Sequence, residues 1–528
     1  MLYKSLRWGR IVISLFVLLL TFVLFIDLYE WVSAETYDTV LFLQFVPSLL
    51  SFIRLFSLIT AGGFLIVLLL TLFTGRLYCS VICPLGILQD IVNRIAKWRS
   101  KKKRFFKFKK AQTALRYIFL SIMVLSVIFG AGWIVTWLDP YSIAGRFFTY
   151  ILKPPVTLIN NLTVSVLTKM DIYSLHRQNL PIPSVLPVLL TLIVTGAIGY
   201  FAWKRGRIFC NTICPVGTLL GLVSKYSFLK VRFNKDLCTR CGRCSGVCKS
   251  ECIDIKNYAV DHSRCVACFN CLDTCPETAL SLTRAKATAN QPEINSPSKE
   301  QIPNDRRKLL VTALALFTGN RIYALKKNKM PSSQQDLIRN VKDHPVAPPG
   351  CVSINRFNNI CTGCSLCVAA CPTNVLQPAL TEYGLSGFMQ PHMDYITSFC
   401  NFDCTKCGEV CPTSAILPLT VEEKHVNQMG KVVFVKENCV VYTDETDCGA
   451  CSEHCPTKAV KMVPYKNGLK IPEVNPDICI GCGACEHPCP VDAPFKAIYV
   501  NGNAVQQIAE KPKEEEQQVI DDKDDFPF

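Results

Sequence analysis

Cysteine spacing constrains this chain more than any other feature of its sequence. The chain has 30 cysteines in 528 residues, far more than a globular protein of this length usually carries. Six segments end in the spacing Cys-x2-Cys-x3-Cys, with a further cysteine shortly before it. With this spacing, three thiolates of one tight loop bind three irons of a [4Fe-4S] cluster, and the fourth cysteine reaches a neighbouring cluster. The pattern therefore predicts a protein built around six such clusters.

Two of these segments follow each other closely in the middle of the chain. Their cysteines are Cys238, Cys241, Cys244 and Cys248, followed by Cys265, Cys268, Cys271 and Cys275. The pattern is typical of bacterial two-cluster ferredoxins, in which the last cysteine of each motif binds the other cluster. We therefore expect Cys275 to complete the first ligand set and Cys248 to complete the second. Lys249 stands where a proline is usual, which changes neither the number nor the spacing of the ligands.

The other four segments lie in the last third of the chain. They contain Cys361, Cys364, Cys367 and Cys371; Cys400, Cys404, Cys407 and Cys411; Cys439, Cys448, Cys451 and Cys455; and Cys479, Cys482, Cys485 and Cys489. The first spacing is stretched in the second and third of these motifs, and we expect those two to pair with each other. Zinc is the main alternative for the first module, at Cys238 to Cys275, and a weaker one, because zinc sites separate their Cys-x2-Cys pairs by about a dozen residues or more. Disulfides suit the first module poorly, because we expect it in the reducing cytosol.

A shorter cysteine motif occurs twice in the first half of the chain. Residues 75–86 read GRLYCSVICPLG and residues 206–217 read GRIFCNTICPVG. Such repetition predicts duplicated helix pairs, each with one Cys-x3-Cys-Pro hook. The hook cysteines, Cys79, Cys83, Cys210 and Cys214, would converge on one four-thiolate metal centre, or would be two reduced thiol pairs that merely end helices. The arginine of each repeat, Arg76 and Arg207, would either offset the charge of that centre or extend to lipid headgroups.

Apolar stretches predict a membrane domain. Half of the residues are hydrophobic and 19% are charged, which excludes collagen-like, fully disordered and ordinary soluble-enzyme classes. A membrane-spanning helix needs about 20 apolar residues. Four stretches meet this requirement, and we expect four transmembrane helices, at residues 11–28, 55–74, 117–138 and 185–203. Residues 40–50 are shorter and contain a proline, so we expect an interfacial or re-entrant piece there.

Basic residues predict the orientation of these helices. Clusters of Lys and Arg at residues 4–10, 94–110 and 204–207 all fall on one side of the expected spans, which is the cytoplasmic side by the positive-inside rule. The amino terminus is therefore expected in the cytoplasm, and the first span reads as an anchor rather than a cleaved signal. The formal net charge of +16 owes much to the second cluster, which suits a membrane face better than a nucleic-acid groove.

The remaining segments complete the expected domain organisation. A membrane domain over residues 1–225 precedes a cytoplasmic two-cluster ferredoxin at 226–283 and a flexible linker at 284–305. Arg306 and Arg307 begin a segment at 306–327 that resembles a twin-arginine export signal, with a cytosolic amphipathic helix as the alternative. Export would carry the four-cluster module at 328–508 to the periplasm, followed by an acidic disordered tail at 509–528. The expected fold class is thus an α-helical membrane domain plus α+β ferredoxin-like domains.

These motifs together resemble two known proteins joined in one chain. Residues 1–283, with both hooks and Leu138-Asp139-Pro140, resemble NapH/MauN-type membrane quinol dehydrogenases. Residues 305–500, with the two arginines and Pro348-Pro349-Gly350, resemble NapG/MauM-type periplasmic ferredoxins. The resemblance implies a protein of the bacterial cytoplasmic membrane that takes electrons from the quinol pool. It would pass them through its clusters to a periplasmic redox protein or terminal reductase, in anaerobic respiration of the periplasmic nitrate reductase kind.

Two other functions fit the same motifs. One is a polyferredoxin that assembles or regulates a metalloenzyme, and the other is a ferredoxin-linked membrane oxidoreductase with all its clusters in the cytosol. Asp139 and His176 are the candidate proton acceptors for quinol, and no other catalytic residue is expected. Cys252 and Cys351 lie outside the motifs, and we interpret them as ordinary buried or near-cluster thiols.

Overall fold

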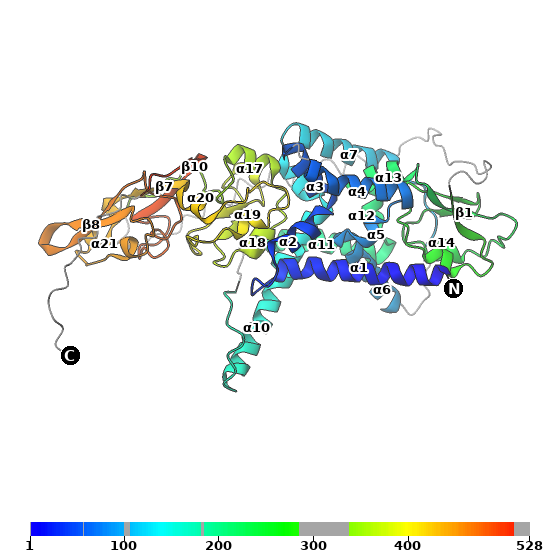
Figure 1. Cartoon of the computed structure of the whole chain (residues 1–528), viewed down its shortest axis with the longest axis horizontal. Helices are drawn as coiled ribbons and strands as arrows, with labels where there is room; N and C mark the ends of the chain where they lie inside the picture. The colour runs from blue at the N-terminus through cyan, green and yellow to red at the C-terminus, as the bar shows by residue number, and fades with distance from the viewer. Residues whose placement is uncertain (1, 56–57, 100–105, 181–183, 285–336, 512–528) are drawn as a thin grey trace.

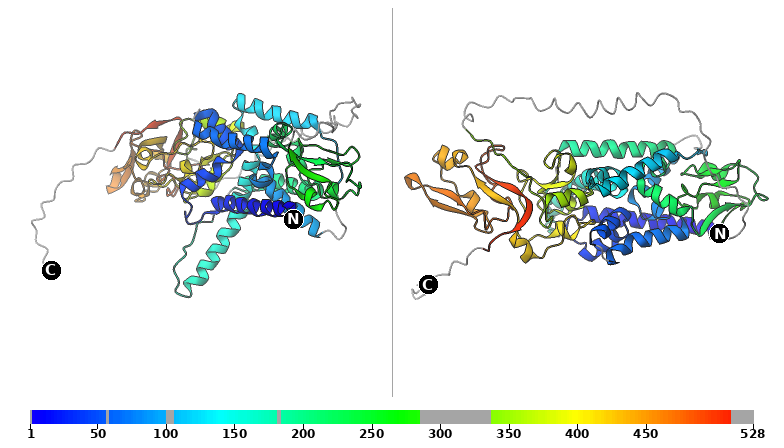
Figure 2. Two further views of the ribbon diagram at one scale, coloured as in Figure 1. Left: turned by 45° about the vertical axis from the view of Figure 1, so that its right-hand side comes forward. Right: turned by 90° about the horizontal axis from the view of Figure 1, so that it is seen from above.

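The computed structural model describes residues 2–55, 58–99, 106–180, 184–284 and 337–511. The molecule is elongated, with a helical domain in the middle and a cysteine-rich module at each end (Figure 1). The two views of Figure 2 give the same arrangement. Nearly all of the expected linker, the twin-arginine segment and most of the expected acidic tail lie outside the described residues.

The helical domain contains thirteen described α-helices and one π-helical segment, η1. They are α1 (Leu2–Ile26), α2 (Ala34–Phe42), α3 (Phe45–Leu55), α4 (Leu58–Thr74), α5 (Tyr78–Val81), α6 (Pro84–Arg99), α7 (Thr113–Ile128), α8 (Gly132–Leu138), α9 (Pro140–Phe147), η1 (Phe148–Leu152), α10 (Lys153–Thr168), α11 (Val185–Arg205), α12 (Ile208–Thr212) and α13 (Pro215–Ser224). Pro84 and Pro215 stand at the first position of α6 and α13, where proline loses no helical hydrogen bond. Each hook therefore has the same local fold, a short helix that holds the first cysteine and a second helix that begins just after the last one.

The expected set of four spans is only partly reproduced. Among the described residues, α1 and α11 are long and apolar enough to cross a membrane as straight helices. The pair α2 and α3 would be a third candidate, bent by 98°, in the region where a re-entrant piece was expected. The second and third expected spans contain α4 and α7, which have 17 and 16 described residues. The 16 residues of α7 are fewer than a straight span needs, whereas α4 begins at Leu58, where the described residues resume. The third ends early because Gly130 adopts a φ of +69°, a left-handed conformation that terminates an α-helix.

The first cysteine-rich module follows α13 and has the α+β character expected of a ferredoxin. Its elements are β1 (Leu229–Phe233), α14 (Arg243–Val247), β2 (Ile253–Asp254), β3 (Ala259–Val260), α15 (Asn270–Thr274) and β4 (Leu280–Arg284). Strands β1 and β4 pair antiparallel, with Leu229 opposite Arg284, and β2 pairs with β3. We call this part the inner module.

The second cysteine-rich region consists of two further units in chain order. The first contains α17 (Ile354–Ile360), α18 (Leu366–Ala370), β5 (Leu376–Pro378), η5 (Gly384–Gly387), β6 (Pro391–Met393) and α19 (Lys406–Glu409). The second contains α20 (Val421–Val426), β7 (Asn427–Phe434), η6 (Lys436–Asn438), α21 (Val440–Thr443), α22 (Ala450–Glu453), β8 (Val460–Pro464), η7 (Lys466–Gly468), β9 (Lys470–Val474) and β10 (Ile498–Ile508). Antiparallel pairs β5–β6, β8–β9 and β7–β10 hold these units together. We call the two units together the outer module.

Helix α1 contacts both modules. Arg7, near its start, forms an ion pair with Asp273 of the inner module. Just beyond its end, Glu30 lies 3.7 Å from Lys406 of the outer module. The 25 residues of α1 span about 37 Å at the rise of an α-helix. The two modules therefore lie at opposite ends of a helix long enough to cross a membrane.

Candidate iron-sulfur sites

The inner module gathers its eight motif cysteines into two groups. Cys238, Cys241, Cys244 and Cys275 line one cavity. Burial raises the pKa of Cys244 to about 11, with the charges of the other three thiols adding to the effect. The second group surrounds Cys271, which lies within electrostatic range of Cys265, Cys268 and Cys248. In both groups the last cysteine of one motif joins the first three of the other, as the spacing predicts.

Cys252 also belongs to this second group, although it lies outside the motifs. Its sulfur lies 3.5 Å from the sulfur of Cys248, and it interacts with Cys265 as well. Its side chain is almost completely buried. Cys252 is therefore a near-group thiol that packs against two of the candidate ligands.

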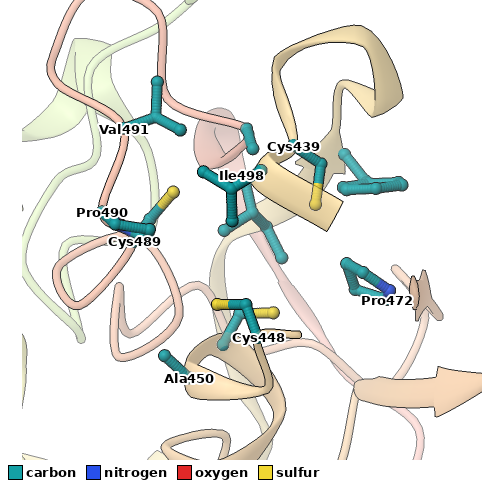
Figure 3. A pocket seen from close by; sticks show the side chains of 12 residues that line it. Cys439, Cys448, Ala450, Pro472, Cys489, Pro490, Val491 and Ile498 are labelled. Atoms are coloured by element: carbon teal, nitrogen blue, oxygen red, sulfur yellow. The ribbon is translucent and has the colours of Figure 1, made fainter. Parts of the chain in front are cut away.

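The outer module forms four groups, and their composition corrects one expectation. The cavity lined by Cys361, Cys364 and Cys367 is completed by Cys411, and the cavity lined by Cys439, Cys448 and Cys451 is completed by Cys489 (Figure 3). In the other two groups, Cys371 lies near Cys400, Cys404 and Cys407, and Cys455 lies near Cys479, Cys482 and Cys485. The motifs therefore pair in chain order, first with second and third with fourth. The expected pairing of the two middle motifs is wrong.

The local structure explains why the stretched spacing led to the wrong pairing of motifs. The extra residues between Cys439 and Cys448 form α21, a single helical turn that starts directly after Cys439. This turn absorbs the insertion and leaves Cys439 beside Cys448 and Cys451. Which two motifs share their cysteine groups is determined instead by the short antiparallel strand pairs β5–β6 and β8–β9. Each pair lies between the two motifs that it brings together.

The cysteine groups fit a cluster better than a single metal ion. Within the described ranges, no three His, Cys, Asp or Glu side chains are grouped as one metal ion requires. A [4Fe-4S] cluster binds each thiolate through a different iron, so its four sulfur ligands surround a larger core than zinc does. Cavities walled by four cysteines match that arrangement.

The four hook cysteines converge in the helical domain. Cys79, Cys83, Cys210 and Cys214 are all buried. Cys214 lies within electrostatic range of the other three, and Cys83 lies within range of Cys79 and Cys210. The two repeats thus contribute two thiols each to one buried group, which could hold a seventh four-thiolate centre.

Two arginines tie the repeats together by crossing between them. Arg76 donates a hydrogen bond of 3.0 Å to the carbonyl of Cys210, and Arg207 donates one to the carbonyl of Cys79. Both side chains are 0% exposed, so neither extends to lipid headgroups. Nη2 of Arg76 also lies 3.8 Å from Sγ of Cys79. This location suits the other expectation, a cation that offsets anionic thiolates.

The glycine at the end of each repeat allows this close approach. A Cβ on Gly86 would lie 2.3 Å from the carbonyl oxygen of Cys79, and a Cβ on Gly217 would lie 2.2 Å from that of Cys210. Both distances are far inside van der Waals contact. Any larger residue would therefore push the second helix of the hook away from the first cysteine.

Asp90 connects the hooks to the inner module. Its carboxylate lies 2.8 Å from Arg207, 2.8 Å from Lys249 and 3.4 Å from Arg10. Burial alone would raise the pKa of Asp90, but Arg207 and Lys249 outweigh it and hold the pKa below its ordinary value. Lys249, the departure from the usual proline, directly follows the candidate ligand Cys248. Sequence spacing gave no sign of this ion-pair network.

The outer module contacts the helical domain through the loop of its first cysteine group. Arg146 of α9 donates a hydrogen bond of 3.3 Å to the carbonyl of Gly363, and Tyr150 of η1 lies 2.8 Å from Oγ of Ser365. Lys153 binds the carbonyl of Ala369. These partners flank Cys361, Cys364 and Cys367, so that group faces the helical domain.

The two candidate proton acceptors lie in different surroundings, one buried and one exposed. Asp139 is completely buried and caps α9, accepting hydrogen bonds from the backbone and hydroxyl of Ser142 at 3.0 and 2.6 Å. His176 lies in an exposed loop, edge-on to the ring of Tyr29. The structure therefore gives Asp139 a capping role and brings neither residue to a cysteine-lined cavity.

Comparison with known proteins supports iron-sulfur binding at the hooks and in most of the outer module, whereas the cysteines of the inner module and Cys439 lie outside the matched ranges. The 4Fe-4S binding domain family matches residues 56–105 and 185–236, which contain the two hooks, and the 4Fe-4S dicluster domain family matches residues 360–415 and 446–493. The chain is similar to the ferredoxin-type protein NapH of Escherichia coli, with 24% identity over 42% of this chain and 67% of the relative. It is also similar to the putative electron transport protein YccM of the same organism (23% identity, 42% and 56%) and to the methylamine utilization ferredoxin-type protein MauN of Paracoccus denitrificans (25% identity, 35% and 53%). No solved structure matches the chain.

Proposed function

We propose that this NapH/MauN-type ferredoxin protein conducts electrons across a bacterial cytoplasmic membrane, from membrane quinol to a redox partner on the periplasmic side. The observation that carries the proposal is the serial arrangement of the cysteine groups. The inner module, the hook group and the outer module follow one another along α1. A conductor needs such a series, whereas a storage or assembly protein does not.

The seven groups would each hold one cluster, six in the two modules and one at the hooks. Each bound [4Fe-4S] cluster supplies a site that takes up and releases one electron. The chain's own contribution is to bury the thiols and to balance their charge. Arg76, Arg207 and Lys249 contribute positive charge near the hooks and the inner module.

Three buried residues, Tyr78, Asp139 and Tyr141, lie between the hook group and the outer module, and we call them the belt. Tyr78 lies within electrostatic range of Cys83 and Asp139, and Tyr141 lies within range of Asp139 and Cys364. All three belt residues are buried. Tyr78, Asp139 and Tyr141 therefore supply a buried path between the hooks and the first outer group.

The docking of the two modules supports their location on opposite sides of the membrane. With the basic amino terminus in the cytoplasm, the inner module lies on the cytoplasmic side, and the far end of α1 carries the outer module outward. An all-cytosolic arrangement would require the outer module to leave its contacts with α9, η1 and Glu30. The periplasmic partner and the terminal electron acceptor would be separate proteins.

The test is anaerobic addition of a menaquinol analogue to the full chain in liposomes, followed by electron paramagnetic resonance of the reduced clusters. Signals from both modules are expected, and a membrane-impermeant oxidant on the outer side should discharge them. Clusters that dithionite reduces but quinol does not would overturn the quinol-fed conductor. Cytosolic reporter signals from fusions after Lys327 and after Phe528 would overturn the periplasmic location.

A further inference from the structure

A large cavity lies between α1, α6 and the edge of the inner module. Its volume is about 390 Å³, within the range of small-molecule sites. Part of the wall is apolar and comes from Trp8, Ile11, Leu15, Ile87 and Ile91. Leu15 is 49% exposed on the outer face of α1, so the cavity adjoins the apolar surface that would face lipid.

An amide in this cavity has no partner. Asn93 of α6 lines the cavity and is 2% exposed, yet neither its Nδ2 nor its Oδ1 has a hydrogen-bond partner. A buried polar group without a partner is costly, so a ligand that reached this amide would be stabilised by it. An amide offers a donor group and an acceptor, so it suits a ligand hydroxyl, which donates and accepts hydrogen bonds, and also a carbonyl oxygen, which accepts one.

Four of the five cations that line the cavity are engaged by other groups, and the fifth, Arg94, is exposed. Arg10 and Lys249 both pair with Asp90, and Arg7 pairs with Asp273. Lys97 lies over the ring of Phe106, 4.9 Å from its centroid. The cavity is thus less suited to an anionic phosphate headgroup than its number of cations suggests, and better suited to a neutral ring with polar edges.

The cavity also touches the neighbours of two cysteine groups. Lys249 and Asn270 line it and directly adjoin Cys248 and Cys271 of the inner module. Ile87, on the opposite wall, lies one helical turn after Cys83. A ligand here would therefore lie between the hook group and the inner module, both of which could exchange electrons with it.

We infer that this cavity binds the headgroup of a membrane quinol or quinone, with Asn93 as a hydrogen-bonding partner and Leu15 beside the path of the isoprenoid tail. The inference rests on the proposed function and deepens it by assigning the donor's site to named residues. It assigns the site to the cytoplasmic end of the helices, away from Asp139 and His176.

The test uses photolabelling of the full, cluster-loaded chain by an azido-quinone analogue, read by mass spectrometry of labelled peptides. Labels are expected in α1 near residues 8–15 and in α6 near residues 87–97. Ile91→Trp fills the cavity and should reduce this labelling at least tenfold. Ile95→Trp is the matched control, because Ile95 lies one turn further along α6, is exposed and does not line the cavity. Asn93→Leu keeps a similar volume and should weaken labelling about tenfold.

The possible outcomes distinguish failure of this quinol site from failure of the proposed function. Unchanged visible absorbance and iron content in each variant establish that the chain has folded and loaded its clusters. Labelling elsewhere that Ile91→Trp leaves unchanged would overturn this site while the quinol-fed conductor stands. No specific labelling anywhere would overturn both. Loss of the label in phosphatidylglycerol vesicles but not in phosphatidylcholine vesicles would show that an anionic lipid headgroup occupies the cavity.

Discussion

Arg76 binds the backbone carbonyl of Cys210, the first cysteine of the opposite repeat, at 3.0 Å. Arg207 makes the equivalent contact with Cys79, so the two repeats are related by an approximate two-fold exchange. The other partners of the two arginines differ, and this difference breaks the symmetry. Arg207 pairs with the carboxylate of Asp90, whereas Arg76 binds the neutral side chain of Asn211 at 2.8 Å.

This difference predicts unequal effects of removing the two arginines. Arg207→Leu deprives the buried Asp90 of one of its two closest cations and should lower the free energy of unfolding by about 3 kcal/mol. Arg76→Leu removes hydrogen bonds to neutral groups and one contact with the sulfur of Cys79, but it leaves no buried carboxylate without this cation, so the loss should be smaller, about 1–2 kcal/mol. Thermal midpoints of the two variants in the same detergent measure the difference. Equal midpoints would contradict the assigned role of Asp90, and Asp90→Asn in the Arg207→Leu background should restore part of the stability.

Removal of a hook thiol should remove one centre. Cys83→Ser is expected to lower the iron content by about four atoms per chain, the content of one [4Fe-4S] cluster. It should also prevent quinol from reducing the outer module while dithionite still does so. Cys351→Ser is the control, because Cys351 is buried but completes none of the seven groups. Iron analysis with unchanged content in Cys83→Ser would show that the hooks are simple thiol pairs.

Double variants can test how the outer motifs pair. Cys439 and Cys489 line the same cavity, so the double change Cys439→Ser and Cys489→Ser should remove a single cluster. Cys439 and Cys455 belong to different groups, so the same change at those two positions should remove two clusters. Iron content and integrated paramagnetic signal distinguish the two results. The reverse pattern would mean that Cys455 completes the Cys439 group.

His262 predicts a pH dependence of the inner module. Burial lowers the pKa of His262 to about 4, helped by the nearby charge of Lys230. The unfolded chain, with a pKa of about 6.5, binds this proton more readily than the folded chain does. The stability of the inner module should therefore be full above about pH 6.5 and should fall as the pH decreases from about 6.5 to 4. Cluster lifetime against pH measures this, and His262→Gln should flatten the slope over that window, while a slope unchanged by the substitution would assign it to other groups.

Sequence spacing predicted the cysteine groups of the inner module correctly, but it did not predict those of the outer module. Cys248 and Cys275 exchange groups as local spacing requires, because the ligand loop of a cluster is short and self-contained. The pairing of Cys439 depended on how an insertion folds, and α21 absorbs it in a way that spacing does not reveal. Hydropathy located the apolar helices but missed the turn at Gly130, where one backbone angle ends α7. The contacts of Lys249 and Asn93 join segments far apart in the chain, and a single sequence holds no signal for them.

Helix α1 precedes both modules in the chain, yet it contacts them through segments that follow much later, at Asp273 and Lys406. Both modules are thus added to a support that is already in place. The direction in which this one helix inserts decides which compartment each module must reach before it can dock. A helix inserted backwards would offer each module the wrong end, so the orientation of α1 would set that of the whole proposed conductor.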